Sequence, residues 1–199
     1  MDKIIVGLTG GIASGKSTAA EMFRDAGAYT IDTDTVSRQV AESEEARKKL
    51  REVFGQAFTG DALDRRALRQ IVFDDARQRN VLNGIMHPLI RRRTADLAAR
   101  ADARVVLIEA PLLFEAGFDA LTDANITVSC PESLRIERLT ARDTITKELA
   151  RRMIAAQLSD SEREARADVV IRNDGNAAQL RAQVLRVYGE LVARAGRDV

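Results

Sequence analysis

The chain has 199 residues, 45% of them hydrophobic and 31% charged, which is the composition of a globular protein with a buried core. Its 31 basic and 30 acidic residues nearly cancel, at a net charge of +1, so we expect no nucleic-acid partner. The apolar runs are too short to cross a bilayer, and a single cysteine excludes an internal disulfide. We therefore expect a cytoplasmic protein without a membrane partner, either a monomer or a small homo-oligomer.

The first elements form a strand, a glycine-rich loop and a helix. Residues 3–8 predict a buried strand, residues 17–24 predict a helix, and Gly27 marks its end. Between them the loop fits the pattern G-x-x-x-x-G-K-[ST], with Gly10, Gly15, Lys16 and Ser17 at the fixed places. A chance match is the alternative. The strand before the loop and the helix after it are the context that a real phosphate loop requires.

This loop predicts a nucleotide site for a physical reason. Its glycines allow successive backbone N–H groups to point at an anion, and the following helix adds its positive N-terminal end. Lys16 can reach the outer phosphates, and the Ser17 hydroxyl can bind Mg²⁺. The residues that we expect around the nucleotide are Gly11, Ile12, Ala13, Ser14, Gly15, Lys16, Ser17 and Thr18.

A second strand, at residues 29–31, is followed by Asp32 and Asp34. Ligands of open α/β sheets bind at the carboxyl ends of the strands, so these carboxylates are well placed to meet a metal and a nucleophile. A plainer interpretation is that Asp34 caps the helix that follows, and the sequence leaves both open.

Residues 35–103 have a different character. Apolar residues recur at helical spacing, no strand is convincing, and we expect a helical insertion between two strands of the sheet. Within it, Pro88 suits the first position of a helix. On pattern alone, a structural role for the neighbouring His87 is favoured over a ligand role.

Two core strands follow the insertion. Residues 104–108 lead to Glu109, at the place of a carboxylate that organises a magnesium ion, although an ordinary loop acid is the alternative. Residues 124–129 form the next strand, followed by Cys130, which we expect to be a small buried residue and no nucleophile.

The last part of the chain alternates helices with one strand. A helix from Pro131 to Arg142 carries Arg135, Arg138 and Arg142 on one face, which is usually a solvated stripe but here suits a lid. We expect a second helix at about residues 146–158, a strand at 168–171, a turn at 173–175 and a closing helix at 177–195.

Strands near residues 4, 29, 105, 126 and 169 thus alternate with helices. This pattern predicts an α/β fold with a five-stranded parallel sheet covered by helices on both faces. We find no D-x-x-G or N-K-x-D elements of a GTPase switch, and the length suits a kinase of small molecules. Another metabolite kinase, or a nucleotide-binding protein without catalysis, remains the alternative.

The chain resembles the dephospho-coenzyme A kinase family over nearly its whole length. The D-x-D after the second strand, the His-Pro pair and P-L-L-F-E are together quite specific. In order, the matching motifs are LTGGIASGKST at 8–18, IDTD at 31–34 with RQV at 38–40, LDRRAL at 63–68 with VF at 72–73, Leu82 and Ile85 with HP at 87–88, PLLFE at 111–115, Arg138 with RD at 142–143, and AD at 167–168 through Ile171 with NDG at 173–175.

The resemblance implies transfer of the γ-phosphate of ATP, with Mg²⁺, to the ribose 3′-hydroxyl of dephospho-coenzyme A. It also implies a P-loop kinase fold with a nucleotide-binding core at residues 1–34 and 104–199. The insertion at 35–103 would bind the substrate, and residues 135–158 would form a lid.

The resemblance also assigns roles to single residues. Asp34 is then the catalytic base, acting with Lys16 and with Arg142, which would reach the ATP phosphates. Two features differ from many members, which carry Asp at the position of Glu109 and Gly at that of Ala13. The remaining assignments are Arg138 and Asn173 for the nucleotide, Phe58, Leu63, Arg65, His87 and Pro111 for the substrate, and Ser17, Asp32 and Glu109 for the metal.

Overall fold

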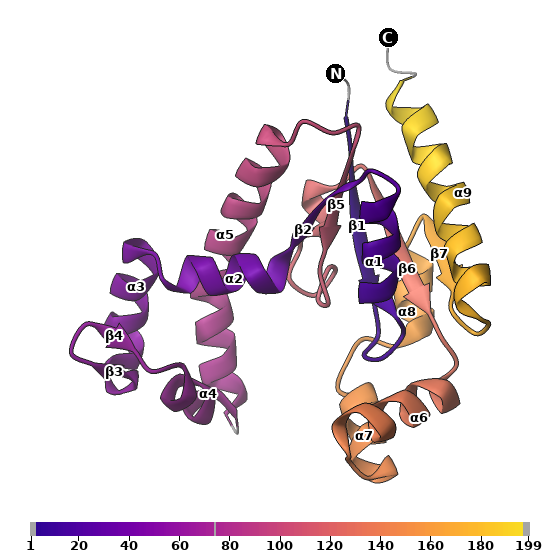
Figure 1. Ribbon diagram of the computed structural model, residues 1–199. Coiled ribbons are helices and arrows are strands. Elements are labelled where there is room, and N and C mark those ends of the chain that lie inside the picture. Colours follow the sequence, from indigo (N-terminus) through magenta and orange to yellow (C-terminus); the bar gives the residue numbers. More distant parts are fainter. Residues whose placement is uncertain (1–2, 74, 197–199) are drawn as a thin grey trace. The chain divides into compact units, whose positions relative to one another are not determined.

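The computed structural model describes residues 3–73 and 75–196 (Figure 1). The backbone forms two compact units, one running up to Asp32 and resuming at Ala98, the other comprising Thr33–Leu97. Within the described residues, no helix is both long enough and apolar enough to span a bilayer.

The first unit is built on a parallel sheet with the strand order β2-β5-β1-β6-β7. Its central strand β1 is buried along almost its full length because it has a strand on either side and packing on both faces. The five parallel strands predicted from the sequence are confirmed. They are β1 (Ile4–Gly10), β2 (Tyr29–Asp32), β5 (Val105–Glu109), β6 (Ala124–Ser129) and β7 (Val169–Arg172).

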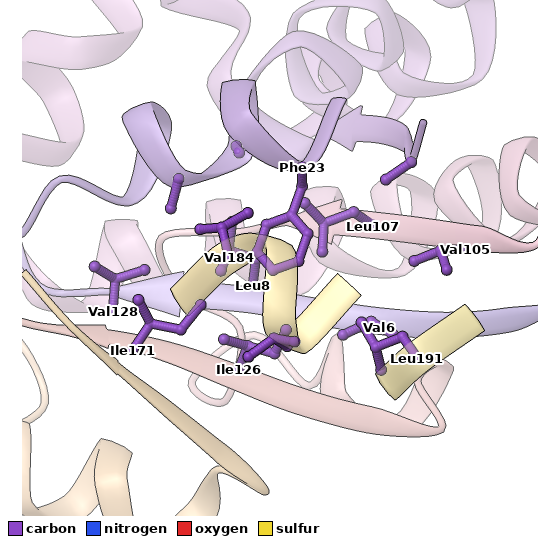
Figure 2. Packing of buried hydrophobic residues seen from close by; sticks show 14 of the residues in the cluster. Val6, Leu8, Phe23, Val105, Leu107, Ile126, Val128, Ile171, Val184 and Leu191 are labelled. Carbon is purple, nitrogen blue, oxygen red and sulfur yellow. The ribbon is translucent and has the colours of Figure 1, made fainter. Parts of the chain in front are cut away.

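Two helices, α1 (Lys16–Asp25) and α9 (Ala177–Ala195), share one core with the sheet. The buried residues of α9 recur every three or four positions, so they form one apolar stripe. Figure 2 shows Phe23 of α1 beside Val184 of α9, over strand residues that include Leu8 and Leu107. This packing fixes the ends of β1 and α1, which are the two elements that flank the glycine-rich loop.

The segment after β6 contains three helices rather than the two that were expected. They are α6 (Glu132–Asp143), α7 (Lys147–Ala155) and α8 (Asp160–Arg166). The helix predicted to end near residue 158 already ends at Ala155. Ser159 then caps α8 in a capping box with Glu162. The α8 helix was missed because it is short and polar, and its Ser-x-x-Glu start is the signal that could have found it. A short 3₁₀ turn, η2 (Asp119–Leu121), lies between β5 and β6.

The second unit is mainly helical, as expected, but it also contains a hairpin, although no strand was convincing in this part of the sequence. Strands β3 (Phe58–Thr59) and β4 (Ala62–Leu63) pair in antiparallel fashion around Gly60, whose φ of 57° is left-handed. Two-residue strands are too short to show an alternating pattern. The other elements are α2 (Thr33–Ala41), α3 (Glu44–Phe54), the 3₁₀ turn η1 (Gly55–Ala57), α4 (Arg65–Phe73) and α5 (Ala76–Arg100).

The prediction that Pro88 begins a helix is wrong. The Asp75 carboxylate accepts hydrogen bonds from the first N–H groups of α5, and the helix continues through Pro88 to Arg100. A proline inside a helix costs about 3 kcal/mol. The residues on either side of it, Met86, Leu89 and Ile90, are buried, and their packing offsets that cost.

Candidate active site

The glycine-rich loop, residues 11–15, joins the buried end of β1 to the first turn of α1. Gly15 has a φ of 93°, and a Cβ at this position would overlap the side-chain amide of Asn173. A Cβ on Gly11 would overlap the guanidinium of Arg135. Both positions therefore need glycine, Gly15 for its backbone conformation and both for the close approach of side chains behind the loop.

Ala13 is the unusual member of this loop. Its φ of 62° lies in the left-handed region, where a Cβ costs roughly 1–2 kcal/mol. The small side chain does fit the position. The cost of the conformation explains why glycine would suit the same position better.

Charged and hydroxyl groups meet where the loop adjoins the sheet edge. The Lys16 ammonium lies 2.5 Å from Glu109 Oε1, and the Ser17 hydroxyl donates to the same oxygen at 3.2 Å. Glu109 is buried at the end of β5, and Asp32 is its register partner at the end of β2. The structure thus brings together Lys16, Ser17, Asp32 and Glu109, as the strand ends predicted.

These groups also suit a magnesium ion. Mg²⁺ prefers oxygen ligands and usually takes only one or two carboxylates from the protein, together with waters and substrate phosphates. The edge offers the Ser17 hydroxyl and the carboxylates of Asp32 and Glu109. Within the described residues, no group of three or more His, Cys, Asp or Glu side chains could hold a metal by itself. The chemistry of the donors therefore fits Mg²⁺ bound together with a nucleotide.

Arg138 and Asn173 support the loop from behind. The Asn173 amide is buried and donates to the Ser14 carbonyl at 2.8 Å, and Arg138 donates to the carbonyls of Ala13 and Asn173, each at 3.3 Å. Arg138 also contacts Cys130, which is buried as expected. Burial raises the pKa of the Cys130 thiol, which disfavours the nucleophilic thiolate.

Arg142 lies in the last turn of α6. Its exposed guanidinium forms two hydrogen bonds with Asp143, at 2.7 and 2.8 Å, and the hydrogen bonding raises the pKa of Arg142. Thr144 follows with a φ of 53°, which is strained for a β-branched residue. The arrangement leaves the Arg142 side chain at the surface beside a strained turn.

Asp34 belongs to the second unit. The interpretation that it caps a helix is wrong, because α2 begins at Thr33 and Asp34 lies exposed in its first turn. A carboxylate in the first turn still complements the positive end of the helix.

Of the four predicted substrate residues in the second unit, three line one cavity and the fourth does not. Leu63, Arg65 and His87 line a cavity of about 260 Å³ whose wall is mostly apolar. Burial, and then the charge of Arg91, lower the pKa of His87. Phe58 is outside the lining and is half-buried under the Arg51 guanidinium, which lies 4.8 Å from its ring centre.

Other residues of the sequence-based assignment, and two that it missed, lie in the first unit. Pro111 follows β5, and its carbonyl accepts a hydrogen bond from Thr9. Arg135 and Gln157 both bind the backbone of Ile12, and neither was assigned to the site. An arginine stripe such as that of Arg135 is usually solvated, yet Arg135 is 1% exposed. Its place on the same helical face as Arg138 was the available signal.

A phosphate loop at the end of the central strand, with a parallel sheet in this order, defines a P-loop kinase fold. The structure of shikimate kinase from Bacteroides thetaiotaomicron shares this fold at a TM-score of 0.54 and 16% identity, covering 94% of this chain and 98% of that one. The crystal structure of TT1252 from Thermus thermophilus is more similar, with a TM-score of 0.82 and 34% identity over 96% of this chain and 99% of that one.

The sequence comparisons identify the family. The family model for dephospho-CoA kinase matches residues 4–179. A dephospho-CoA kinase of Bacillus licheniformis is 42% identical over 188 residues, which are 91% of this chain and 93% of the relative. The chain therefore belongs to the dephospho-CoA kinase family.

Proposed function

We propose that this protein transfers the γ-phosphate of ATP to the ribose 3′-hydroxyl of dephospho-CoA, giving CoA and ADP in the last step of CoA synthesis. Family membership over residues 4–179 is the observation that carries the proposal. The buried single thiol, Cys130, suits a reducing compartment, and we place the reaction in the cytoplasm.

The phosphate loop accounts for the donor side of the reaction. Phosphoryl transfer needs little covalent chemistry from a protein, so its main tasks are positioning and charge neutralisation. Backbone N–H groups of the loop and the N-terminal end of α1 would hold the phosphates. The Lys16 ammonium, which pairs with Glu109, would exchange this partner for the outer phosphates.

Mg²⁺ would be held by Ser17, Asp32 and Glu109, of which the hydroxyl and one carboxylate already share a hydrogen bond. When bound, the ion supplies positive charge to the phosphate oxygens. Glu109 would change from an ion-pair partner of Lys16 to a ligand of the metal or of its bound water.

Asp34 would be the base. A sugar hydroxyl is a weak nucleophile, and a carboxylate at hydrogen-bond distance both orients it and accepts its proton. The D-x-D motif of the family supports this assignment, and so does the position of Asp34 two residues beyond the end of β2.

We propose the cavity of the second unit as a binding site for dephospho-CoA. Its apolar wall includes Leu63 and Met86, and its polar groups include Arg38, Arg65 and His87. Such a mixture suits a ligand that combines apolar parts with phosphates. Arg65 already holds the Arg38 carbonyl and Glu42, so the guanidinium has a fixed place beside the cavity.

Residues 135–158 would act as the lid, in which the turn around Arg142 would move and Arg142 would reach the transferred phosphate. Its exposed position and the strained Thr144 beside it support movement of this turn.

ADP release in a coupled assay tests the activity. Dephospho-CoA is compared with a panel of nucleosides and sugars, and Lys16→Ala serves as the blank. We expect turnover with dephospho-CoA alone, whereas preference for another acceptor would overturn the proposed function.

A further inference from the structure

Ile12, within the phosphate loop, has both of its backbone polar groups bound by side chains of the segment that follows β6. Its N–H donates to Gln157 Oε1 at 2.8 Å, and its carbonyl accepts from Arg135 Nε at 2.9 Å. Gln157 lies just beyond α7 and Arg135 lies in α6. Two side chains that are separated in sequence thus hold the two peptide groups on either side of the Ile12 Cα.

The apolar contacts of this region reinforce the same attachment. Ile12 and Ala13 pack against a buried cluster formed by Ile136, Leu139 and Ala150 of α6 and α7. The polar and apolar contacts of Ile12 therefore come from the same part of the chain.

The strained residue of the loop, Ala13, comes directly after Ile12. Ala13 holds a φ of 62°, and its own carbonyl is bound by Arg138. Strained backbone persists only where the surrounding structure over-determines it. Without the two contacts to Ile12, the loop would relax away from this strained conformation.

Burial of the Arg135 guanidinium costs free energy of folding. Arg135 is 1% exposed, and its Nη1 donates to Asp160 Oδ2 at 2.6 Å, while Asp160 also accepts from the equally buried Arg163 at 2.9 Å. Within the described residues, Arg135 Nη2 has no hydrogen-bond partner. A buried guanidinium with an unsatisfied N–H is a poor source of stability, so stability alone does not explain its place behind Gly11.

We propose that Arg135 and Gln157 are positioning residues that hold the phosphate loop in its binding conformation before ATP arrives. The proposal rests on the proposed function in so far as this loop binds ATP. A preorganised loop loses less conformational freedom on binding, so the two residues strengthen ATP binding without touching the nucleotide. Once the triphosphate is bound, it holds the loop itself, and the chemical step gains little from them.

Calorimetry of MgATP binding to Gln157→Met tests this proposal. Methionine keeps the length of the side chain but cannot accept the hydrogen bond from Ile12. We expect the Kd for ATP to rise about five- to tenfold, the usual effect of one such hydrogen bond. The kcat at saturating ATP and the KM for dephospho-CoA should stay within about twofold of wild type. Arg135→Met should weaken ATP binding in the same way, because Asp160 keeps Arg163 as its partner.

Lys3→Met is the matched control. It also removes hydrogen bonds from a side chain to backbone carbonyls, those of Ala98, Ala99 and Ala101, but at the opposite end of β1. We expect it to lower the thermal stability and to leave the Kd for ATP unchanged.

Circular dichroism checks the fold of each variant, and if one variant fails to fold, the other decides alone. An unchanged Kd for ATP in a folded variant would overturn the proposal, as would an equal loss of affinity for dephospho-CoA. ATP binding needs no acceptor substrate, so the role of Arg135 and Gln157 is tested even if dephospho-CoA proves not to be phosphorylated. In that case the proposed function would fail by itself.

Discussion

Three acidic residues lie at or just beyond the ends of the neighbouring strands β5 and β2. Glu109 and Asp32 face each other across β5 and β2, and Glu109 already holds Lys16 and Ser17. Asp34 follows β2 in the first turn of α2, so the acids of the D-x-D motif belong to different elements. We therefore assign them different tasks, Asp32 to the metal and Asp34 to the hydroxyl.

Asp34→Asn tests the second of these tasks. Asparagine keeps the size of the side chain but is a much weaker proton acceptor, so kcat should fall about a hundredfold or more. Binding of either substrate should change far less, because the lost interaction matters mainly in the transition state. Steady-state kinetics and calorimetry give both numbers.

Glu44→Gln is the control, since Glu44 is an exposed acid in the first turn of α3. Both substitutions remove a charge that favours the helix N-terminus, at a cost of roughly 0.3–1 kcal/mol. If Asp34→Asn retains most of its turnover, the assignment of the base is wrong, and Asp32 becomes the next candidate.

His87, the only histidine in the chain, predicts a dependence of stability on pH. Its pKa in the folded protein lies below 6.5, because burial and the charge of Arg91 disfavour protonation. The unfolded chain therefore binds more protons than the folded one in the range just below pH 6.5, and the free energy of unfolding falls as the pH is lowered through it. Titration with urea at about pH 7.5 and about pH 5.5 measures this fall.

His87→Gln should show a smaller fall over the same interval. The carboxylates titrate in both proteins, so their contribution cancels in the comparison. An equal fall in wild type and variant would show that His87 is not the source.

The elements differ in how far the sequence predicted them. The long helix α9 was predicted with its observed limits, because its buried residues form a regular stripe. The α8 helix has no such stripe, and its buried residue is Arg163. The Asp160 carboxylate pairs with both Arg163 and Arg135 of α6. Helix α5 passes through Pro88 because the packing of its neighbours outweighs the local preference. For α5, tertiary contacts outweigh the local preference, whereas α8 carries a local start signal, Ser159 with Glu162, but no stripe to extend it.

Arg142 lies just before the turn between helices α6 and α7, and we predict a role for it in the transition state. We expect Arg142→Ala to lower kcat about a hundredfold, the scale of one lost charge-stabilising contact in a transition state. The Kd for ATP should change only modestly, because the exposed guanidinium pairs with Asp143 beside it. Arg186→Ala removes a similarly exposed arginine that pairs with Glu190 on α9, and should leave kcat unchanged.

Hydrogen exchange of residues 135–158, with and without both substrates, tests the motion directly. We expect slower exchange around Arg142 when both are bound. An unchanged exchange rate would count against a lid.

For the whole molecule, the sheet and its ligand-binding edge could be predicted from the sequence. Alternating strands and helices imply a parallel sheet, and the carboxyl ends of its strands meet at one edge, which places Asp32 and Glu109 together. The support behind the loop could not be predicted. Arg135 and Gln157 lie more than a hundred residues from Ile12 in the sequence, and motif spacing says nothing about such pairs.

Phosphorus NMR of the reaction product tests the central claim most directly. The protein is incubated with MgATP and dephospho-CoA, and Lys16→Ala is run in parallel as the blank. We expect ADP and one new phosphomonoester on the 3′-oxygen of the ribose, in equal amounts, with neither formed by the variant. A phosphate on another oxygen, or no transfer to dephospho-CoA by a folded protein that binds ATP, would contradict it.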